Sequence, residues 1–364
     1  MANTARRGFI RFLIPGFVFQ SILIAGGYGT GAEICQYFGS SGLVGGLMGA
    51  LVTTLLWAVL CAVSFEFARV FRTFDYNSMM MKLIGRIGVL FEISYVVLLL
   101  IVLGVVNATA GSMIREFADV SPWIGIFILN AAILLLVIKG TEAIENALTF
   151  WSVVLYAVYI VFMLIVFSRF GSNVATELAK EEVKSGWFVK GCQYAFYNVA
   201  CVPAFLYTIR DAKSRGEAVA CGIIAGFIGV IPAAVLLLAM GCNLAEVVAN
   251  EVPITVIFKM INMPVFYLIF DIVLFGTLIE TGAGFIKGVV DRIEVTYAGK
   301  GSGTMPAWLR PLVSVALVIV GICVSTFGLI GLIARGYGTI CWVFLLIYAL
   351  PMVTIGIYKI SKAK

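Results

Sequence analysis

The chain has 364 residues, of which 62% are hydrophobic and only 12% are charged, and its mean hydropathy is +1.08. Such a composition excludes a soluble domain and predicts an all-α membrane protein with many spans. A transmembrane barrel is excluded as well, because the apolar runs are long and continuous rather than short and alternating. Lys and Arg at cytoplasmic helix ends explain the net charge of +6 better than nucleic-acid binding does.

Several classes of catalytic and metal site are excluded by residues that the sequence lacks. Histidine is absent, which removes His-based zinc sites and His proton relays. The eight cysteines are scattered through apolar runs with no CxxC pair, so they predict neither a metal cluster nor a disulfide framework. The sequence also has no paired-aspartate protease signature and no nucleophile elbow, so we expect a protein that is not an enzyme.

Apolar stretches long enough to cross a bilayer, about 20 residues each, recur ten times. They cover residues 8–38, 43–71, 87–114, 122–138, 143–167, 187–209, 218–240, 264–290, 308–329 and 339–358. A polar, amphipathic stretch at 173–185 is expected to form a surface helix, and a semi-polar connector follows at 243–262. Most of the 25 Lys and Arg residues fall on the side of the N-terminus. The protein is therefore predicted to lie in the plasma (inner) membrane with both termini cytoplasmic.

The first apolar run is interrupted near its middle by the sequence AGGYGTGAE at 25–33. Each glycine in a helix interior costs about 1 kcal/mol relative to alanine, and a frayed helix in hydrocarbon leaves backbone groups unpaired. Such a break persists where the backbone lines a cavity or binds something, although Gly27 and Gly31 could instead form a GxxxG packing pair. Glu33 follows the break and could bind a cation, carry a proton, cap the next helix or lie wet at the interface.

The sixth apolar run is predicted to break as well, because Pro203 removes a helix hydrogen bond and Asn198 offers an amide just before it. Four spans separate the two breaks, and the two broken spans enter the membrane from opposite sides. This order indicates an inverted repeat of five plus five spans with a site at the midplane. We expect one transmembrane domain at 8–360, with repeats at 8–170 and 187–360 and an extracellular amphipathic connector at 171–186.

The sequence around both breaks resembles the LeuT-fold transporters of the amino acid–polyamine–organocation superfamily, and among them the YkvI-type permeases assigned to amino acids. The resemblance lies in GGYGTGAE at 26–33 with QYF at 36–38, and in YAFYN at 194–198. It covers the whole chain in the number and order of spans. It implies a transporter whose first and sixth helices are discontinuous.

The predicted substrate site lies beside the two breaks and the middle of the third span. Its residues are Gly26, Gly27, Tyr28, Gly29, Thr30, Gly31, Glu33, Gly104, Asn107, Tyr194, Phe196, Tyr197 and Asn198. The sixth-span aromatics could form a lid over the substrate, although aromatic residues are ordinary in membrane helices. We expect non-helical backbone at 26–31 and 197–203, with the two breaks facing each other across one cavity.

The resemblance also implies a sodium ion, because in LeuT-like proteins the eighth helix offers hydroxyls to sodium held against first-helix carbonyls. The corresponding ligands here are Thr277, Thr281 and the carbonyl of Ala25. The usual adjacent Ser/Thr pair is missing, as is the fifth-span lysine that replaces sodium in some proton-coupled relatives. Glu33 and Glu280 are therefore candidates for proton coupling, since a carboxylate held away from water can take up a proton.

The sequence thus predicts a cation-coupled symporter of an amino acid or related small zwitterion or amine. A substrate exchanger and an ion channel without ion-coupled uptake remain the alternatives. The expected partners are a small-molecule substrate and the lipid bilayer, with no nucleic acid. The chain is expected to act as a monomer or homodimer, with bound Na+ as the one ion considered and no cofactor.

Overall fold

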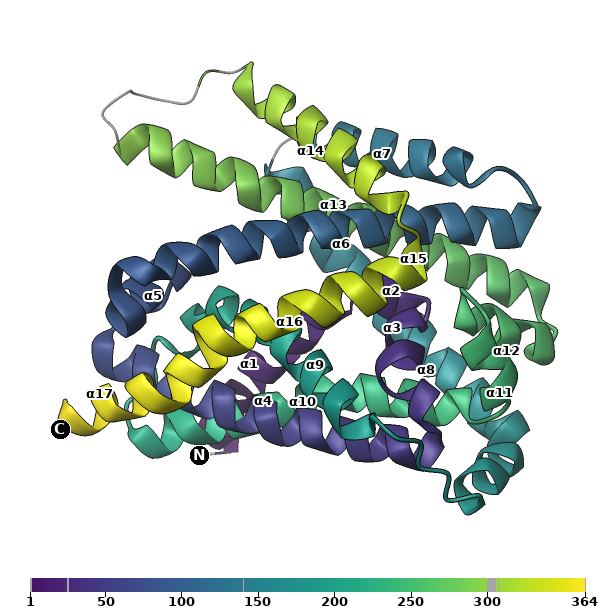
Figure 1. Ribbon diagram of the computed structural model, residues 1–364, viewed down its shortest axis with the longest axis horizontal. Helices are drawn as coiled ribbons and strands as arrows, with labels where there is room; N and C mark the ends of the chain where they lie inside the picture. The colour runs from purple at the N-terminus through teal and green to yellow at the C-terminus, as the bar shows by residue number, and fades with distance from the viewer. Residues whose placement is uncertain (1, 25, 140, 300–305, 307, 364) are drawn as a thin grey trace.

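The structure, a computed structural model, describes residues 2–24, 26–139, 141–299, 306 and 308–363, and in these residues the chain is helical with no strand (Figure 1). Within this part of the chain, six helices are long and apolar enough to cross a membrane. They are Leu43–Phe71, Tyr76–Ala118, Val154–Ala179, Arg215–Met240, Pro264–Val290 and Leu329–Lys362. Three shorter apolar helices, Phe12–Leu23, Pro122–Ile138 and Leu309–Ser325, and the helical segment at 187–209 complete the ten predicted spans.

In the first half of the chain, one span is divided and four are continuous. The first span consists of α1 (Ala2–Leu23), α2 (Gly26–Gly29) and α3 (Ala32–Tyr37). The second to fifth are α4 (Leu43–Phe71), α6 (Val89–Ala118), α7 (Pro122–Lys139) and α8 (Thr141–Ala179). The short connecting helices are η1 (Gly39–Ser41), α5 (Tyr76–Ile84) and η2 (Gly85–Gly88).

In the second half, the sixth and tenth spans change their winding along their length. The sixth begins as α9 (Trp187–Asn198) and continues as the 3-10 helix η3 (Val199–Ile209). The seventh to ninth are α10 (Arg215–Met240), α13 (Pro264–Gly299) and α14 (Leu309–Ser325), with α11 (Leu244–Ala249) and α12 (Pro253–Ile261) between α10 and α13. The tenth joins α15 (Leu329–Gly331), the π-helix η4 (Leu332–Tyr337), α16 (Gly338–Phe344), the π-helices η5 (Leu345–Ala349) and η6 (Met352–Gly356), and α17 (Ile357–Lys362).

The spans pack in symmetric pairs. The second span packs along the seventh, and the first contacts the sixth. The first packs on the seventh as the sixth packs on the second, and the third packs on the ninth as the eighth packs on the fourth. The third contacts the tenth as the eighth contacts the fifth. Exchanging each span for the one five places later preserves this pattern, as expected for two repeats related by a two-fold axis. The residue boundaries of the repeats stay a prediction.

Small residues let the second and seventh spans approach backbone to backbone. A Cβ at Gly222 of α10 would collide with the backbone of Ala62, and one at Gly226 would collide with Ala58. Glycines spaced in this way allow close helix contact, which membrane helices use in place of a hydrophobic driving force. The paired α4 and α10 form the surface against which the first and sixth spans lie.

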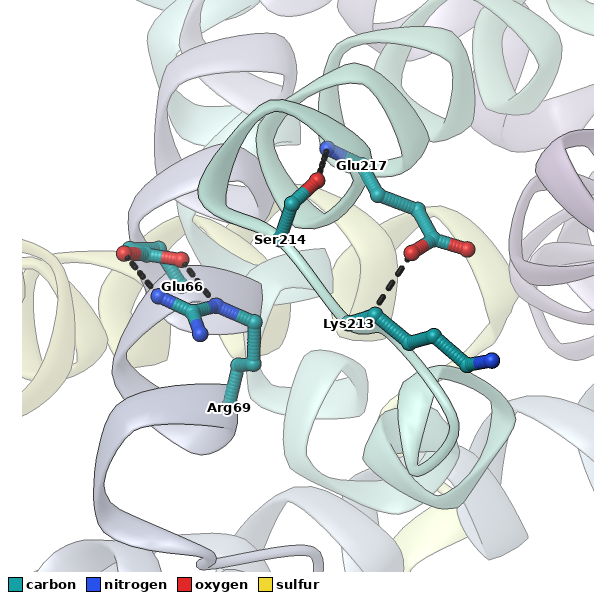
Figure 2. Close-up of polar contacts among 5 residues, drawn as sticks. All are labelled: Glu66, Arg69, Lys213, Ser214 and Glu217. Carbon is teal, nitrogen blue, oxygen red and sulfur yellow. Dashed lines mark hydrogen bonds and ion pairs between the residues drawn. The ribbon is translucent and has the colours of Figure 1, made fainter.

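Helix α10 begins at a capped position beside the ion pair of Glu66 and Arg69 (Figure 2). Ser214 Oγ accepts the Glu217 N–H at 3.2 Å, and the Glu217 carboxylate accepts the Lys213 N–H at 2.7 Å. Arg69 donates two hydrogen bonds to the buried Glu66 carboxylate, at 2.7 and 2.8 Å. Because the first N–H groups of a helix lack partners within it, this capping fixes where the seventh span starts. Both chain termini lie toward this end, at left in Figure 1, whereas α11 and α12 lie at the other end.

Differences from the sequence-based expectation include those in the fifth, sixth and tenth spans. Helix α8 continues to Ala179, because Val174 and Leu178 still pack on the core, so no separate surface helix begins at 173. The tenth span begins at Leu329 rather than at 339. The sixth span does not unwind over 197–203 but tightens into a 3-10 helix at Val199, and its kink lies at Phe205 (φ −116°, ψ 15°).

Candidate functional site

The first span is interrupted on both sides of the short helix α2. Ile24 leaves the helical conformation after α1, and Thr30 and Gly31 form a turn between α2 and α3. Gly31 has a φ of +81°, which favours glycine, and a Cβ there would collide with the Met240 side chain. The break predicted from the glycines is confirmed. Its extent is corrected, because Gly26–Gly29 forms a helical turn instead of staying irregular.

Protein groups hold the backbone of this break in place. The Thr30 hydroxyl donates to the Gly27 carbonyl at 3.2 Å, and the Thr30 carbonyl accepts the Ile254 N–H of α12 at 3.1 Å. The Tyr159 hydroxyl of α8 donates to the Gly29 carbonyl at 2.7 Å. Carbonyl groups released from a helix need partners where water is absent, so these contacts explain how the irregular backbone persists in the interior.

Glu33 lies in the first turn of α3 with only 4% of the residue exposed. One carboxylate oxygen accepts a hydrogen bond from the Tyr197 hydroxyl at 2.6 Å. The other oxygen lies against Gly27, where a Cβ would stand 2.5 Å from it. The ion pairs of the described residues lie elsewhere, so a phenol and no basic side chain holds this carboxylate. Its burial excludes the interpretation of Glu33 as an acid that is wet at the interface.

Four tyrosines from three spans gather beside Glu33, and we call Tyr37, Tyr194, Tyr197 and Tyr337 the tyrosine cluster. The ring centroids of Tyr37, Tyr194 and Tyr197 form a triangle with sides of 5.6, 5.7 and 5.5 Å. The Tyr337 ring of η4 stacks on Tyr197 at 4.6 Å. Every member is buried and interacts electrostatically with Glu33. The cluster therefore brings the first, sixth and tenth spans together around one acid.

The sixth-span residues predicted to bind substrate divide into two sets. Tyr194 and Tyr197 belong to the tyrosine cluster, next to the first-span acid. Phe196 is buried with its ring toward Trp342 of α16, at 6.4 Å between centroids. Asn198 donates its amide to the carbonyl of Tyr194, one turn earlier on its own helix, at 2.9 Å. The structure therefore brings only the two tyrosines of this motif to Glu33.

The third-span residues are directed toward neighbouring helices. A Cβ at Gly104 would collide with Val324, which indicates close packing on the ninth span. Asn107 donates to the Leu103 carbonyl at 2.8 Å and accepts a hydrogen bond from Asn130 of α7 at 2.5 Å. Their assignment to substrate stays a prediction, and these contacts give both residues a role in joining helices.

The predicted sodium ligands are only partly described. Ala25 lies outside the described residues. Thr277 is buried, and its hydroxyl donates to the Val273 carbonyl of its own helix at 3.1 Å. Thr281 is half-buried one turn further along α13, and Glu280 interacts electrostatically with Tyr156 of α8. Leu274, one turn before Thr277, contacts Gly29, so this face of α13 lies beside the break.

A lid formed by α11, α12 and the residues between them covers the break at the end opposite the termini. Ile254 of α12 binds the Thr30 carbonyl, as described above. Glu251 pairs with Arg115 of α6 and accepts a hydrogen bond from Ser112 at 3.0 Å, and Lys259 pairs with Glu116. Two ion pairs thus tie this α11–α12 lid to the third span.

A cavity of about 80 Å³ lies between α3, the lid and the tenth span. Its lining residues are Ala32, Cys35, Gln36, Ser40, Val248, Asn250, Glu251, Pro253, Ile330 and Ile333. Ala32 precedes Glu33, and the Ile333 carbonyl accepts the Tyr37 hydroxyl at 2.9 Å. The cavity therefore borders the tyrosine cluster on the side of the lid.

Sequence reasoning did not select three residues that the structure places at the site. Tyr37 and Tyr337 complete the tyrosine cluster, and Tyr159 holds the carbonyl of Gly29. Tyr37 lies only four residues after Glu33 in the sequence, so its position could have predicted that it belongs to the site. Tyr159 and Tyr337 stand among other apolar and aromatic residues of long spans, where no local pattern distinguishes them.

No protein-family model matches this chain. The Bacillus subtilis membrane protein YkvI, described as uncharacterized, is 22% identical over 290 residues, which cover 76% of this chain and 80% of that protein. Among solved structures, a substrate-bound, outward-open Na+-coupled sialic acid symporter is similar with a TM-score of 0.58 and 11% identity. That match covers 94% of this chain and 77% of the symporter.

Two further solved structures are similar over almost all of the chain. The manganese transporter of Eremococcus coleocola, in a mutant form, gives a TM-score of 0.52 with 16% identity, covering 93% of this chain and 84% of that one. Mhp1, a transporter of the nucleobase-cation-symport-1 family, gives 0.52 with 14% identity, covering 92% and 76%. At these identities the likeness shows the fold, and the chain has the LeuT fold. The three neighbours are described with unlike substrates, so the substrate must be inferred from the site.

Proposed function

We propose that the protein is a secondary active transporter, a cation-coupled symporter that moves an amino acid or related small zwitterion or amine by alternating access. The observation that carries this proposal is the buried carboxylate of Glu33, beside a broken first span and against tyrosines of the sixth and tenth spans. An acid inside a membrane domain is costly and marks a functional site by default. The two-repeat fold supplies two groups of helices that can move about this site.

Sodium is the coupling ion that we propose first. Irregular backbone carbonyls coordinate sodium in transporters with broken helices, and the Gly29 carbonyl and Thr277 hydroxyl lie on adjoining elements here. The Tyr159 hydroxyl and the Val273 carbonyl occupy these two oxygens, so sodium would displace both hydrogen bonds. Protons are the second candidate, with Glu33 and Glu280 as carriers.

Uptake by the purified protein in proteoliposomes tests the proposal. Labelled amino acids and amines are supplied outside, with an inward sodium gradient or with choline replacing sodium at fixed pH. We expect saturable accumulation that requires the sodium gradient. Uptake that choline leaves unchanged would overturn sodium coupling, and failure of every solute to accumulate under a sodium or proton gradient would overturn the symporter.

The two alternatives predict different fluxes in the same vesicles. A substrate exchanger moves labelled substrate only when unlabelled substrate is present inside. A channel equilibrates the solute without saturation and without an ion gradient. The buried break favours alternating access over a channel, because an open pore needs a continuous polar path and Glu33 has almost no exposed surface.

We propose that the chain lies in the plasma (inner) membrane with both termini in the cytoplasm. The basic residues and the even number of spans support this orientation, and both ends of the chain lie toward one end of the molecule (Figure 1). The partners are then a small-molecule substrate and lipid, with the chain acting as a monomer or homodimer.

A further inference from the structure

The charge around Glu33 is unbalanced. The carboxylate is buried and has a phenol as its hydrogen-bond donor, while the ion pairs of the described chain lie at its surface or at the end of α4. A charge taken out of water needs a partner of opposite charge or must be neutralised. This position therefore suits a cation that arrives from outside the protein.

The tyrosine cluster supplies the second half of a cation site. Cations are attracted to the faces of aromatic rings when they lie within about 6 Å of the ring centroid. Tyr37, Tyr194 and Tyr197 contact one another in a triangle, and Tyr37 and Tyr337 stand on helices that belong to different repeats. Separation of these helices would present ring faces on several sides of a ligand held at Glu33.

An aromatic cluster elsewhere in the chain shows what plain core packing looks like here. Phe19, Trp57 and Phe205 also pack tightly, with centroids at 4.8 and 5.0 Å. Those rings join the first, second and sixth spans, and two of the three carry no polar atom. In the tyrosine cluster, by contrast, one hydroxyl donates to a buried acid and another donates to the Ile333 carbonyl. Its polar atoms therefore make specific hydrogen bonds in addition to the packing of the rings.

The same geometry disfavours a zwitterion. The carboxylate of a zwitterion needs donors near the break, but the donor found there, the Tyr197 hydroxyl, is already bound by the carboxylate of Glu33. A second carboxylate there would be repelled by the first. The cavity that borders the cluster has Glu251 as its only charged lining residue, and Glu251 is paired with Arg115, so the cavity lining offers no basic side chain to a carboxylate.

We infer that the substrate is a compact organic cation, an amine without a carboxylate, with Glu33 as its counter-ion and the tyrosine cluster as its aromatic surround. This inference rests on the proposed transport function and narrows its substrate class. On binding, the cation exchanges its hydration water for contacts with the carboxylate and the ring faces. The Tyr197 hydroxyl holds the carboxylate in position.

A set of probes with one alkyl group tests the inference on the purified full-length protein. Isobutylamine is the cation, valine is the zwitterion with the same alkyl group, and 3-methylbutanoate is the anion. Binding is measured by thermal shift in detergent and then by labelled uptake into proteoliposomes. Isobutylamine is expected to bind at least about tenfold more tightly than valine, and the anion is expected not to bind.

Matched variants identify the carboxylate responsible. Glu33→Gln is expected to weaken isobutylamine binding at least about tenfold, and Tyr197→Phe to weaken it less. Glu92→Gln is the control, because Glu92 also accepts a hydrogen bond from a tyrosine, Tyr76, at 2.8 Å but lies outside the cluster. Tetramethylammonium, which cannot donate a hydrogen bond, should retain measurable binding if the ring faces contribute.

The outcomes separate the inference from the function on which it rests. Saturable uptake of valine in preference to isobutylamine would overturn the cation while leaving the transporter in place. Isobutylamine binding that Glu33→Gln leaves unchanged would also overturn the inference. Absence of uptake for every probe under any ion gradient would overturn the proposed function, and the inference with it.

Discussion

Gly29 and Gly31 are the residues at which the broken first span leaves no room for a side chain. Leu274 occupies the space over Gly29, and Met240 occupies the space over Gly31. Replacing either glycine with leucine is expected to abolish uptake while the protein still inserts, because the larger side chain displaces the backbone at the break. Proteoliposome uptake and elution as a single folded species measure the two effects.

Gly171 is the matched control for these substitutions. It lies on α8 with no atom within 4 Å of a built Cβ, so Gly171→Leu is expected to leave uptake unchanged. If the Gly29 and Gly31 variants transport as the wild type does, the glycines serve helix packing alone.

The Tyr159 hydroxyl provides a second prediction for a single residue. It supplies the hydrogen bond to the Gly29 carbonyl, so Tyr159→Phe leaves that buried carbonyl without its partner. The variant is expected to lose about 1–3 kcal/mol of unfolding free energy. Chemical denaturation in detergent measures this loss.

Tyr156, one turn earlier on α8, is the comparison residue. Its hydroxyl is buried and has no hydrogen-bond partner in the described structure. Tyr156→Phe therefore removes an unsatisfied group and is expected to be neutral or stabilising. Equal losses for both tyrosines would show that the bond to the break contributes nothing.

Among the structural elements, the α11–α12 lid is predicted to limit access to the site from its side. It is tied to α6 by the Glu251–Arg115 and Glu116–Lys259 pairs, and it covers the cavity that Cys35 lines. Replacing Glu251 and Glu116 with glutamine is expected to raise the labelling rate of buried Cys35 by a membrane-impermeant maleimide. Two partly exposed pairs worth ~1 kcal/mol together predict a rise of about fivefold, read by peptide mass spectrometry.

A surface ion pair on the same side separates this effect from a general change of charge. Glu177 pairs with Lys180, three residues later in the sequence, so this pair does not join two helices. Glu177→Gln is expected to leave Cys35 labelling unchanged. A double variant of the lid that labels as slowly as the wild type would show that other contacts hold the lid shut.

Local sequence predicted which spans are interrupted better than it predicted the backbone conformation at each interruption. The glycine cluster predicted where the first span breaks, because no helix tolerates four glycines in hydrocarbon without other support. Pro203 predicted a disturbance in the sixth span, but the chain tightened its winding there instead of opening. The choice between these responses depends on the neighbouring helices, which the sequence alone does not place. The contact of Tyr37 with the tenth span is of the same kind, since almost three hundred residues separate the partners.

For the whole molecule, the coupling ion determines which substitutions stop concentrative uptake. If sodium drives transport, Thr277→Val and Thr281→Val are expected to raise the half-saturating sodium concentration about tenfold, equivalent to ~1.4 kcal/mol, because each removes an oxygen ligand. If protons drive it, Glu280→Gln abolishes concentrative uptake but spares exchange. Sodium titrations of initial uptake rates, with a parallel exchange assay, separate the two.

Thr354 provides the control for the threonine substitutions. Its hydroxyl also donates to a carbonyl four residues earlier, but the residue is exposed in the tenth span. Thr354→Val is expected to leave the sodium dependence unchanged. If Thr354→Val shifts the half-saturating sodium concentration as much as Thr277→Val does, the effect comes from removing any helix hydroxyl and not from loss of a sodium ligand.

The overall architecture followed from the number and order of apolar runs, and the ten predicted spans are present. The packing of the second span on the seventh follows from the repeat, yet the small residues that allow it, Gly222 and Gly226, were recognisable only once their partners were placed. The proposed sodium site shows a different limit of prediction from sequence. Two threonines on one face of α13 were evident, but their hydroxyl partners depend on side-chain rotation.

The π-helical turns of the tenth span are interruptions of its α-helical hydrogen bonding that could shift along the helix. A π turn encloses one more residue than an α turn, and η4 ends at Tyr337, whose ring lies on Tyr197. If the π turn shifts along the helix by one turn, the side chains between its old and new positions rotate about the helix axis by about 100°. This is the angle between successive residues of an α-helix. Tyr337 would then swing off Tyr197 while the helix axis stays where it is. Such a shift of the π turn along the tenth span would uncover one face of the site. Backbone hydrogen bonds would change partners without a net loss.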